Sequence, residues 1–173
     1  FGDEVRTFCM NPYGEVVAEN YSGIATVNGH SYANKRTANT NFALLVSEKF
    51  TEPFKEPIAY GQHVARLANM LSGGILVQRF GDLLDGRRST PERIKSSIIT
   101  PTLQCATPGD LSLVLPYRQM TAIIEMLKAL DKIAPGVASR YTLLYGIEVK
   151  FYAGGVKRTK ERETEQVKEL FTI

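Results

Sequence analysis

The chain has 173 residues, of which 43% are hydrophobic and 23% charged, and its net charge is +3. These values are typical of a folded globular domain, and the weak positive charge does not by itself indicate nucleic-acid binding. No apolar run approaches the ~18 residues of a membrane span, so we expect no membrane contact. Two distant cysteines, Cys9 and Cys105, exclude a disulfide framework and favour a reduced, cytoplasmic protein. The chain begins at Phe1, and we expect it to be a piece of a longer protein.

The first 50 residues have the pattern of a β-rich region. Strands are predicted at 4–10 and 14–18, and the sequence Asn-Pro-Tyr-Gly between them predicts a hairpin turn. A third strand is expected at 23–27. Residues 28–41 are polar and irregular, and the compact apolar run 42–47 predicts a buried strand.

Helical patterns follow. Apolar residues at 3.6-residue spacing predict a helix at about 58–71, which the glycines at 73 and 74 should end. Residues 75–84 are predicted to be a short helical or turn-rich piece. The polar, basic segment 85–97 is predicted to be an exposed loop.

The clearest helical signal lies after residue 106. Thr107 is expected to cap a short helix, and Pro116 to start a longer one that stops at 135–136. The apolar stripe of this longer helix is predicted to comprise Met120, Ile123, Ile124, Leu127, Leu130 and Ile133.

The last part of the chain returns to β patterns. Residues 146–152 alternate as in a half-buried strand, and 157–169 suggest a charged hairpin. We therefore predict an α+β fold, in which a small, mostly antiparallel β-sheet or barrel carries an inserted helical lobe. The β part would cover about 1–50 and 140–173, and the helical lobe about 55–138, within a single domain.

Local motifs for catalysis are lacking. The sequence has no GxGxxG, GxxxxGK[ST] or HExxH motif, and we expect no metal site. Cys9 is expected to be a buried, inert thiol, and His63 to lie at the surface. His30 lies in the polar 28–41 stretch, which either satisfies its own backbone or presents donors and acceptors to a ligand.

Four stretches carry a resemblance to a known family. They are "VRTFCMNPYGEVVAE" (5–19), "VNGHSYANKRTANTNFALLV" (27–46), "TPGDLSLVLP" (107–116) and the run from 146 to 173. In this order they resemble the inserted middle domain of the uncharacterised bacterial FAD-dependent dehydrogenase family. A second cysteine and a glycine of the family pattern are replaced here by Asn11 and Tyr13, so a local dithiol is not expected.

The resemblance implies a substrate-binding or cap domain of an FAD-dependent oxidoreductase. Its partner would be a split Rossmann-type FAD-binding domain of the same polypeptide, and its substrate an unknown small molecule. The fragment alone would bind no FAD and would be inactive, although its exposed apolar patch could let it form a homodimer. By analogy, the residues facing substrate or flavin would be Cys9, Asn28, Ser31, Tyr32, Asn39 and Asn41.

Two other functions remain open from the sequence. A non-enzymatic binding module would bind nucleic acid through Arg87, Arg88, Arg93 and Lys95, although scarce aromatic residues argue against it. A hydrolase would use Cys9 with His30 or His63, and no local motif supports that arrangement.

Overall fold

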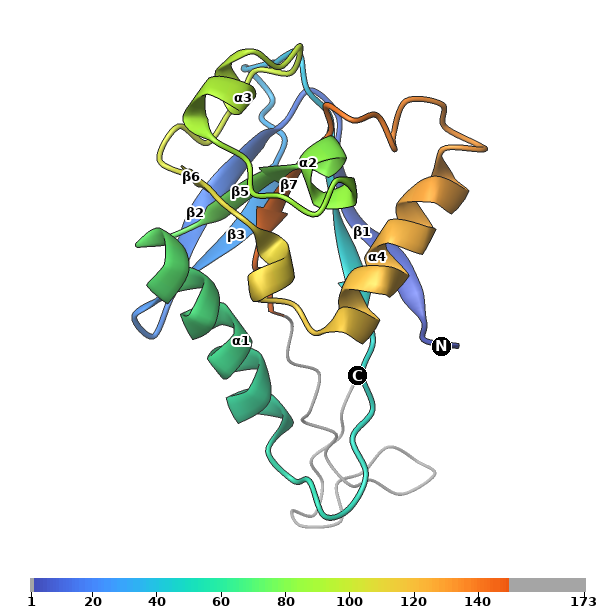
Figure 1. Cartoon of the computed structure of the whole chain (residues 1–173). Coiled ribbons are helices and arrows are strands. Elements are labelled where there is room, and N and C mark those ends of the chain that lie inside the picture. Colours follow the sequence, from blue (N-terminus) through green and yellow to red (C-terminus); the bar gives the residue numbers. More distant parts are fainter. Residues whose placement is uncertain (1, 150–173) are drawn as a thin grey trace, which may run out of the picture.

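A computed structural model describes residues 2–149 of the protein. The strands are β1 (Val5–Asn11), β2 (Glu15–Tyr21), β3 (Ile24–His30), β4 (Asn41–Val46), β5 (Leu76–Arg79), β6 (Thr107–Pro108) and β7 (Leu143–Gly146). The helices are α1 (Pro57–Ser72), α2 (Phe80–Leu84), α3 (Pro91–Lys95), the 3₁₀ helix η1 (Leu111–Leu113) and α4 (Tyr117–Leu130). Within this part of the chain the strands form three small, mostly antiparallel sheets and no closed barrel (Figure 1), which confirms the α+β class.

The four N-terminal strands form two antiparallel ribbons, β1–β4 and β2–β3. The predicted hairpin between the first two strands is therefore wrong, because neither of these strands pairs with the other. The tight hairpin instead joins β2 to β3 through Ser22 and Gly23, whose φ angles are 51° and 81°. Two successive positive φ values suit the right-handed twist of a two-residue hairpin, which explains the use of glycine there.

The third sheet has the order β6–β5–β7 and contains the most deeply buried strand. Leu76, Val77 and Gln78 of β5 are each at most 2% exposed. The prediction of a helical or turn-rich piece over 75–84 is wrong for this strand, although α2 follows it directly. Because the strand is buried on both faces, its apolar run lacks the alternation that would have marked it as β.

Two predictions after residue 106 also need correction. Thr107 does not cap a helix but lies in β6, which runs parallel to β5. Asp110 is the cap instead, because its side chain accepts a hydrogen bond from the Ser112 amide at the start of η1. Of the strand predicted at 146–152, residues 147–149 are not in a strand, since β7 ends at Gly146, and 150–152 lie outside the described residues.

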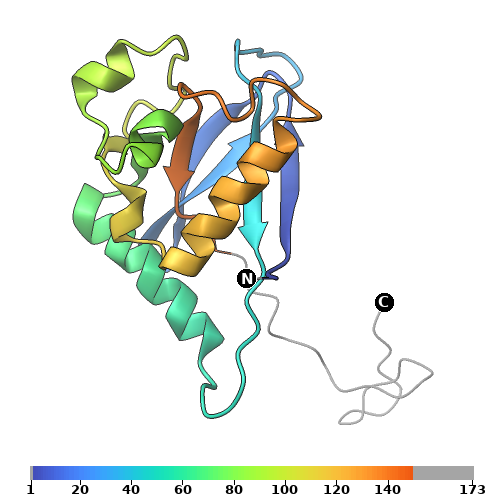
Figure 2. The ribbon, with the colours of Figure 1, turned by 45° about the vertical axis from the view of Figure 1, so that its right-hand side comes forward.

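Both long helices confirm their predicted positions, although α4 ends at Leu130, before the predicted stop at 135–136. Helix α1 ends at Gly73, whose left-handed φ of 69° is that of a helix-terminating glycine. Helix α4 starts after Pro116 and buries Met120, Ala122 and Leu127. Figure 2 shows α4 crossing in front of the β1–β4 ribbon, while α1 contacts β3 and β5. The apolar stripe of α4 ends earlier than predicted, because Ile133 lies beyond the helix and is 81% exposed.

The basic segment 85–97 is less irregular than predicted, because it contains α3. Thr90 caps this short helix by accepting a hydrogen bond from the Arg93 amide. The predicted charged hairpin at 157–169 lies outside the described residues. None of the helices in residues 2–149 combines the length and the apolar character needed to cross a membrane.

Candidate functional site

A large cleft lies between the β1–β4 ribbon, the first turns of α1, helix α4 and β7. Its volume is about 1510 Å³. All six residues of β4 and all four of β7 line it, and so do Met120, Ile123 and Leu127 of α4. Continuous stretches of two strands therefore border the cleft. Its walls are largely apolar, and Asn28, Asn39 and Asn41 are among its polar lining residues.

Aromatic side chains form one wall of the cleft. Phe50, Phe54 and Tyr60 pack as a trio, with ring centroids of Phe50 4.6 Å from Phe54 and 5.1 Å from Tyr60. This trio holds the segment after β4 against the start of α1. Burial, together with the nearby Glu48 carboxylate, raises the pKa of Tyr60.

A second tyrosine, Tyr145 of β7, also lines the cleft. Burial raises its pKa to about 12. Tyr60 and Tyr145 thus keep their phenolic protons at neutral pH, and both hydroxyls can serve as neutral hydrogen-bond donors.

Three of the six residues predicted to face a ligand line this cleft: Asn28, Asn39 and Asn41. Asn28 Nδ2 donates to Glu19 Oε1 at 3.0 Å, and Asn39 Nδ2 donates to the Thr100 carbonyl at 2.8 Å. Asn41 Nδ2 is buried and has no hydrogen-bond partner within the described residues. An unpaired buried amide is costly, so Asn41 Nδ2 would gain from an acceptor that a ligand could supply.

Cys9 is exposed, and the prediction of a buried thiol is wrong. The pairing of β1 with β4 is irregular between Phe8 and Asn11, and Cys9 has a positive φ of 46°. Such a bulge changes the direction in which side chains point. The predicted burial of Cys9 assumed the regular alternation of side chains along a strand, which the bulge interrupts. Asn11 Nδ2 donates to both the Cys9 carbonyl and Asn41 Oδ1, so the bulge is tied to the cleft rim without Cys9 lining it.

Ser31 and Tyr32 do not line the cleft either. Ser31 Oγ donates to the Pro12 carbonyl at 3.0 Å, and the Thr37 amide donates to the Tyr13 carbonyl at 3.0 Å. These bonds fasten the segment between β3 and β4 onto the Asn-Pro-Tyr-Gly turn. Tyr32 remains exposed on this tip.

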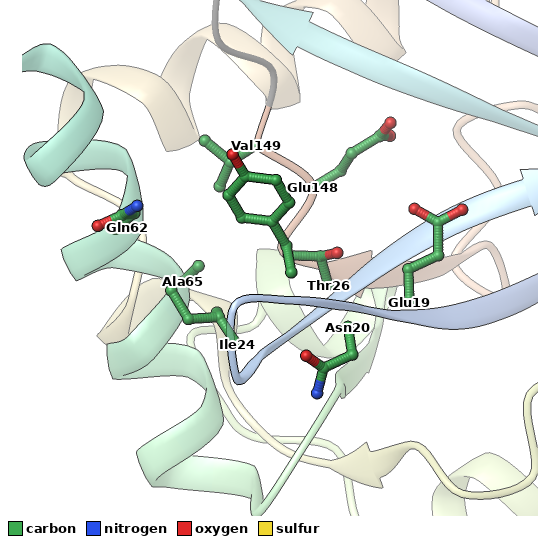
Figure 3. A pocket seen from close by; sticks show the side chains of 9 residues that line it. Glu19, Asn20, Ile24, Thr26, Gln62, Ala65, Glu148 and Val149 are labelled. Carbon is green, nitrogen blue, oxygen red and sulfur yellow. The ribbon is translucent and has the colours of Figure 1, made fainter.

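A smaller pocket of about 230 Å³ adjoins the cleft and shares Glu148 and Val149 with it. Figure 3 shows it between α1, which contributes Gln62 and Ala65, and the β2–β3 hairpin, which contributes Glu19, Asn20 and Thr26. Its described lining contains two carboxylates and no basic residue. His30 lies beside it at the exposed end of β3, with Nε2 3.7 Å from Glu19 Oε1.

The sequence reasoning missed the apolar and aromatic lining, because it searched for ligand-facing groups among polar residues. Residues 42–47 were expected to form a buried strand, whereas all six residues are half-buried. His63 is exposed, as predicted. Within residues 2–149 no three His, Cys, Asp or Glu side chains gather closely enough to hold a metal ion.

Residues 2–151 match a family model described as "FAD-dependent protein, C-terminal domain-like". A search of curated proteins returned no match. The matched residues include both ribbons, both long helices and every strand that borders the cleft.

Proposed function

The chain belongs to the FAD-dependent protein, C-terminal domain-like family, and we propose that it is the substrate-binding or cap domain of an FAD-dependent oxidoreductase. The cleft would then receive a small-molecule substrate beside the flavin ring. The observation that carries this proposal is the size and composition of the cleft. Its volume of about 1510 Å³ exceeds the roughly 300–1,000 Å³ of a typical small-molecule pocket, which leaves room for a substrate and a ring system together.

The residues of the cleft suit the flat ring system of FAD but not its pyrophosphate. Apolar and aromatic walls with a few amide and phenol groups suit a flat ring system that carries polar edges. The sequence contains no glycine-rich turn to hold the pyrophosphate. This difference supports a division in which another domain of the same polypeptide holds the dinucleotide, with a split Rossmann-type domain around an inserted middle domain as the proposed arrangement.

When bound, the flavin would supply the redox chemistry. The contribution of this chain would be to bind, orient and shield. Asn41 has a buried amide nitrogen with no partner within the described residues, Tyr145 is a neutral donor, and the aromatic trio makes one wall apolar. On this basis the chain alone would be inactive.

The first test compares absorption spectra of the purified parent polypeptide and of this chain. We expect flavin bands near the usual positions in the parent and none in the chain. A parent that is colourless and also takes up no added FAD would overturn the proposal. With a coloured parent, substrates can be screened by bleaching of the flavin under anaerobic conditions.

The second test blocks the cleft in the parent. Ala134 lines the cleft and is exposed, so Ala134→Trp should fill part of it without disturbing the core. We expect flavin content to be retained and the KM for an identified substrate to rise at least about tenfold, which corresponds to ~1.4 kcal/mol of lost binding. The matched control is Ala129→Trp, at an exposed position of α4 that does not line the cleft. Equal kinetics of the two variants would contradict a substrate role for the cleft.

A further inference from the structure

A cluster of cationic side chains lies at the end of β5, and none of these side chains lines the cleft. Figure 1 shows α2 and α3 at the upper end of the molecule, opposite the segment that follows β4. Chain segments far apart in sequence meet there: Arg79 ends β5, Arg87 and Arg93 come from the segment around α3, and Arg140 and Tyr141 precede β7. We call Arg79, Arg87, Arg93, Arg140 and Tyr141 the arginine cluster.

A buried carboxylate organises this cluster. Asp82 is 1% exposed, and it accepts hydrogen bonds from Ser89 Oγ at 2.8 Å and from Arg87 Nε at 3.0 Å. Burial alone would raise the pKa of Asp82, but the hydrogen bonds from Ser89 and Arg87 hold it below its usual value. Asp82 therefore remains charged at neutral pH and fixes the loop that carries the arginines.

The cations of this region outnumber its carboxylates. Arg87 spans Asp82 and Asp85, and Arg140 also pairs with Asp85. Arg93 Nε lies 4.0 Å from Asp82, at the limit of an ion pair. Arg79 has no carboxylate at ion-pair distance within the described residues, so the cluster retains a net positive charge.

Arg79 has hydrogen-bond donors that are incompletely paired within the described residues. Its guanidinium lies over the Tyr141 ring, with Cζ 5.1 Å from the ring centroid, and Nη1 makes only a long 3.4 Å bond to the Arg93 carbonyl. Its Nε is buried and has no hydrogen-bond partner in residues 2–149. An unpaired buried donor is costly. Arg79 Nε would therefore be stabilised by an acceptor, which a ligand or a small shift of the side chain could supply.

We propose that the arginine cluster is a binding site for a phosphate group, with Arg79 and Arg93 as its main ligands. Guanidinium groups bind phosphate oxygens through paired N–H donors, and the stacking on Tyr141 together with the Asp82 network holds these groups in place before a ligand arrives. A phosphate would supply the acceptors that Arg79 lacks and offset the surplus positive charge. This site is separate from the cleft, and the proposal does not depend on the function of the cleft.

The test titrates inorganic pyrophosphate into the 173-residue chain and follows the Arg Nε–H signals in ¹H–¹⁵N spectra. We expect saturable shifts of the Arg79 and Arg93 signals. Arg79→Gln and Arg93→Gln should each weaken binding about tenfold, because each removes charge-assisted hydrogen bonds to the phosphate oxygens. Arg93 is partly exposed, so its variant should fold even if Arg79→Gln proves unstable.

The matched control is Arg66→Gln, which removes the same charge from an exposed position of α1. Its affinity should stay within twofold of that of the unchanged chain. Absence of saturable shifts, or equal weakening by Arg66→Gln, would overturn the proposal. So would an RNA oligonucleotide that binds this face without competition from pyrophosphate.

Two further ligands distinguish the source of the phosphate. Tighter binding of ADP than of phenyl phosphate would support the diphosphate of a nucleotide as the natural ligand. Tighter binding of phenyl phosphate would support a phosphorylated small molecule. Either order supports the site, provided that Arg93→Gln weakens the preferred ligand.

Discussion

The β6–β5–β7 sheet and the β1–β4 ribbon differ in how completely their residues are buried. In the central strand of the sheet, Leu76, Val77 and Gln78 are covered on both faces, with help from α1 and η1. In the ribbon, all six residues of β4 are half-buried, and of the seven residues of β1 four are exposed and three half-buried. The sheet thus has its core within this chain, whereas the ribbon leaves part of its surface at the cleft.

This difference helps to separate stability from function. Residues around β5 have their packing partners in place, so their substitution should act mainly on folding. Residues of β4 that face the cleft have room for further partners, so their substitution should act mainly on whatever occupies it. The predictions that follow measure this contrast, beginning with the largest effect.

Phe80→Ala should strongly destabilise the chain. Phe80 is 1% exposed and belongs to the main hydrophobic core, and removing a buried phenyl group leaves a cavity. We expect the free energy of unfolding to fall by about 4 kcal/mol, as measured by urea denaturation.

Leu45→Ala is the comparison for Phe80→Ala. Leu45 is a half-buried residue of β4 that lines the cleft. Its truncation should lower the free energy of unfolding by only about 1 kcal/mol, because less apolar surface is removed from contact. Equal losses for the two variants would show that the ribbon is as fully packed as the sheet, which would contradict the proposed difference between them.

Asp82→Asn should have an intermediate effect. The substitution keeps an acceptor for Ser89 but removes the charge that pairs with Arg87. We expect a loss of about 2 kcal/mol in the free energy of unfolding at pH 7, because a buried charge-assisted bond is lost.

The pH dependence gives this prediction a second readout. The pKa of Asp82 is depressed in the folded state, so its contribution is present above the unfolded pKa and is lost as pH falls through the folded pKa. The stability difference between the unchanged chain and Asp82→Asn should therefore be full at pH 7 and shrink in acid, below about pH 4. A difference that stays constant down to pH 2.5 would contradict the role assigned to the Asp82 charge. Ser96→Ala, at an exposed position near the same loop, is the control and should show little change.

Helical periodicity was the most reliable signal in the sequence. It located both long helices, because an amphipathic face and a terminating glycine or proline are local features. Strand positions near the N-terminus were also found, whereas strand pairing was not. Pairing depends on contacts across the chain, and nothing local shows that β1 lies beside β4.

The candidate site was only partly predictable for the same reason. Asn28, Asn39 and Asn41 could be proposed from their polar setting, and all three line the cleft. The aromatic trio and β7 could not, because apolar residues that face a cleft have the same composition as those that face a core. Arg79 and Arg140 were likewise missed, since 60 residues separate them and only the fold brings Arg79 beside Tyr141 and Arg140 to Asp85.

A second small effect is predicted for the β2–β3 hairpin, whose turn the sequence pattern had placed elsewhere. Gly23 has a φ of 81°, and a Cβ added there would meet no atom within 4 Å. Gly23→Ala therefore tests backbone conformation alone, and we expect a loss of about 1 kcal/mol in the free energy of unfolding. Gly74→Ala is the matched control, because it also has open space around it but lacks a positive φ. If both variants proved equally stable, the turn would have to relax at little cost, and the β2–β3 ribbon would be less rigid at this end than its regular pairing indicates.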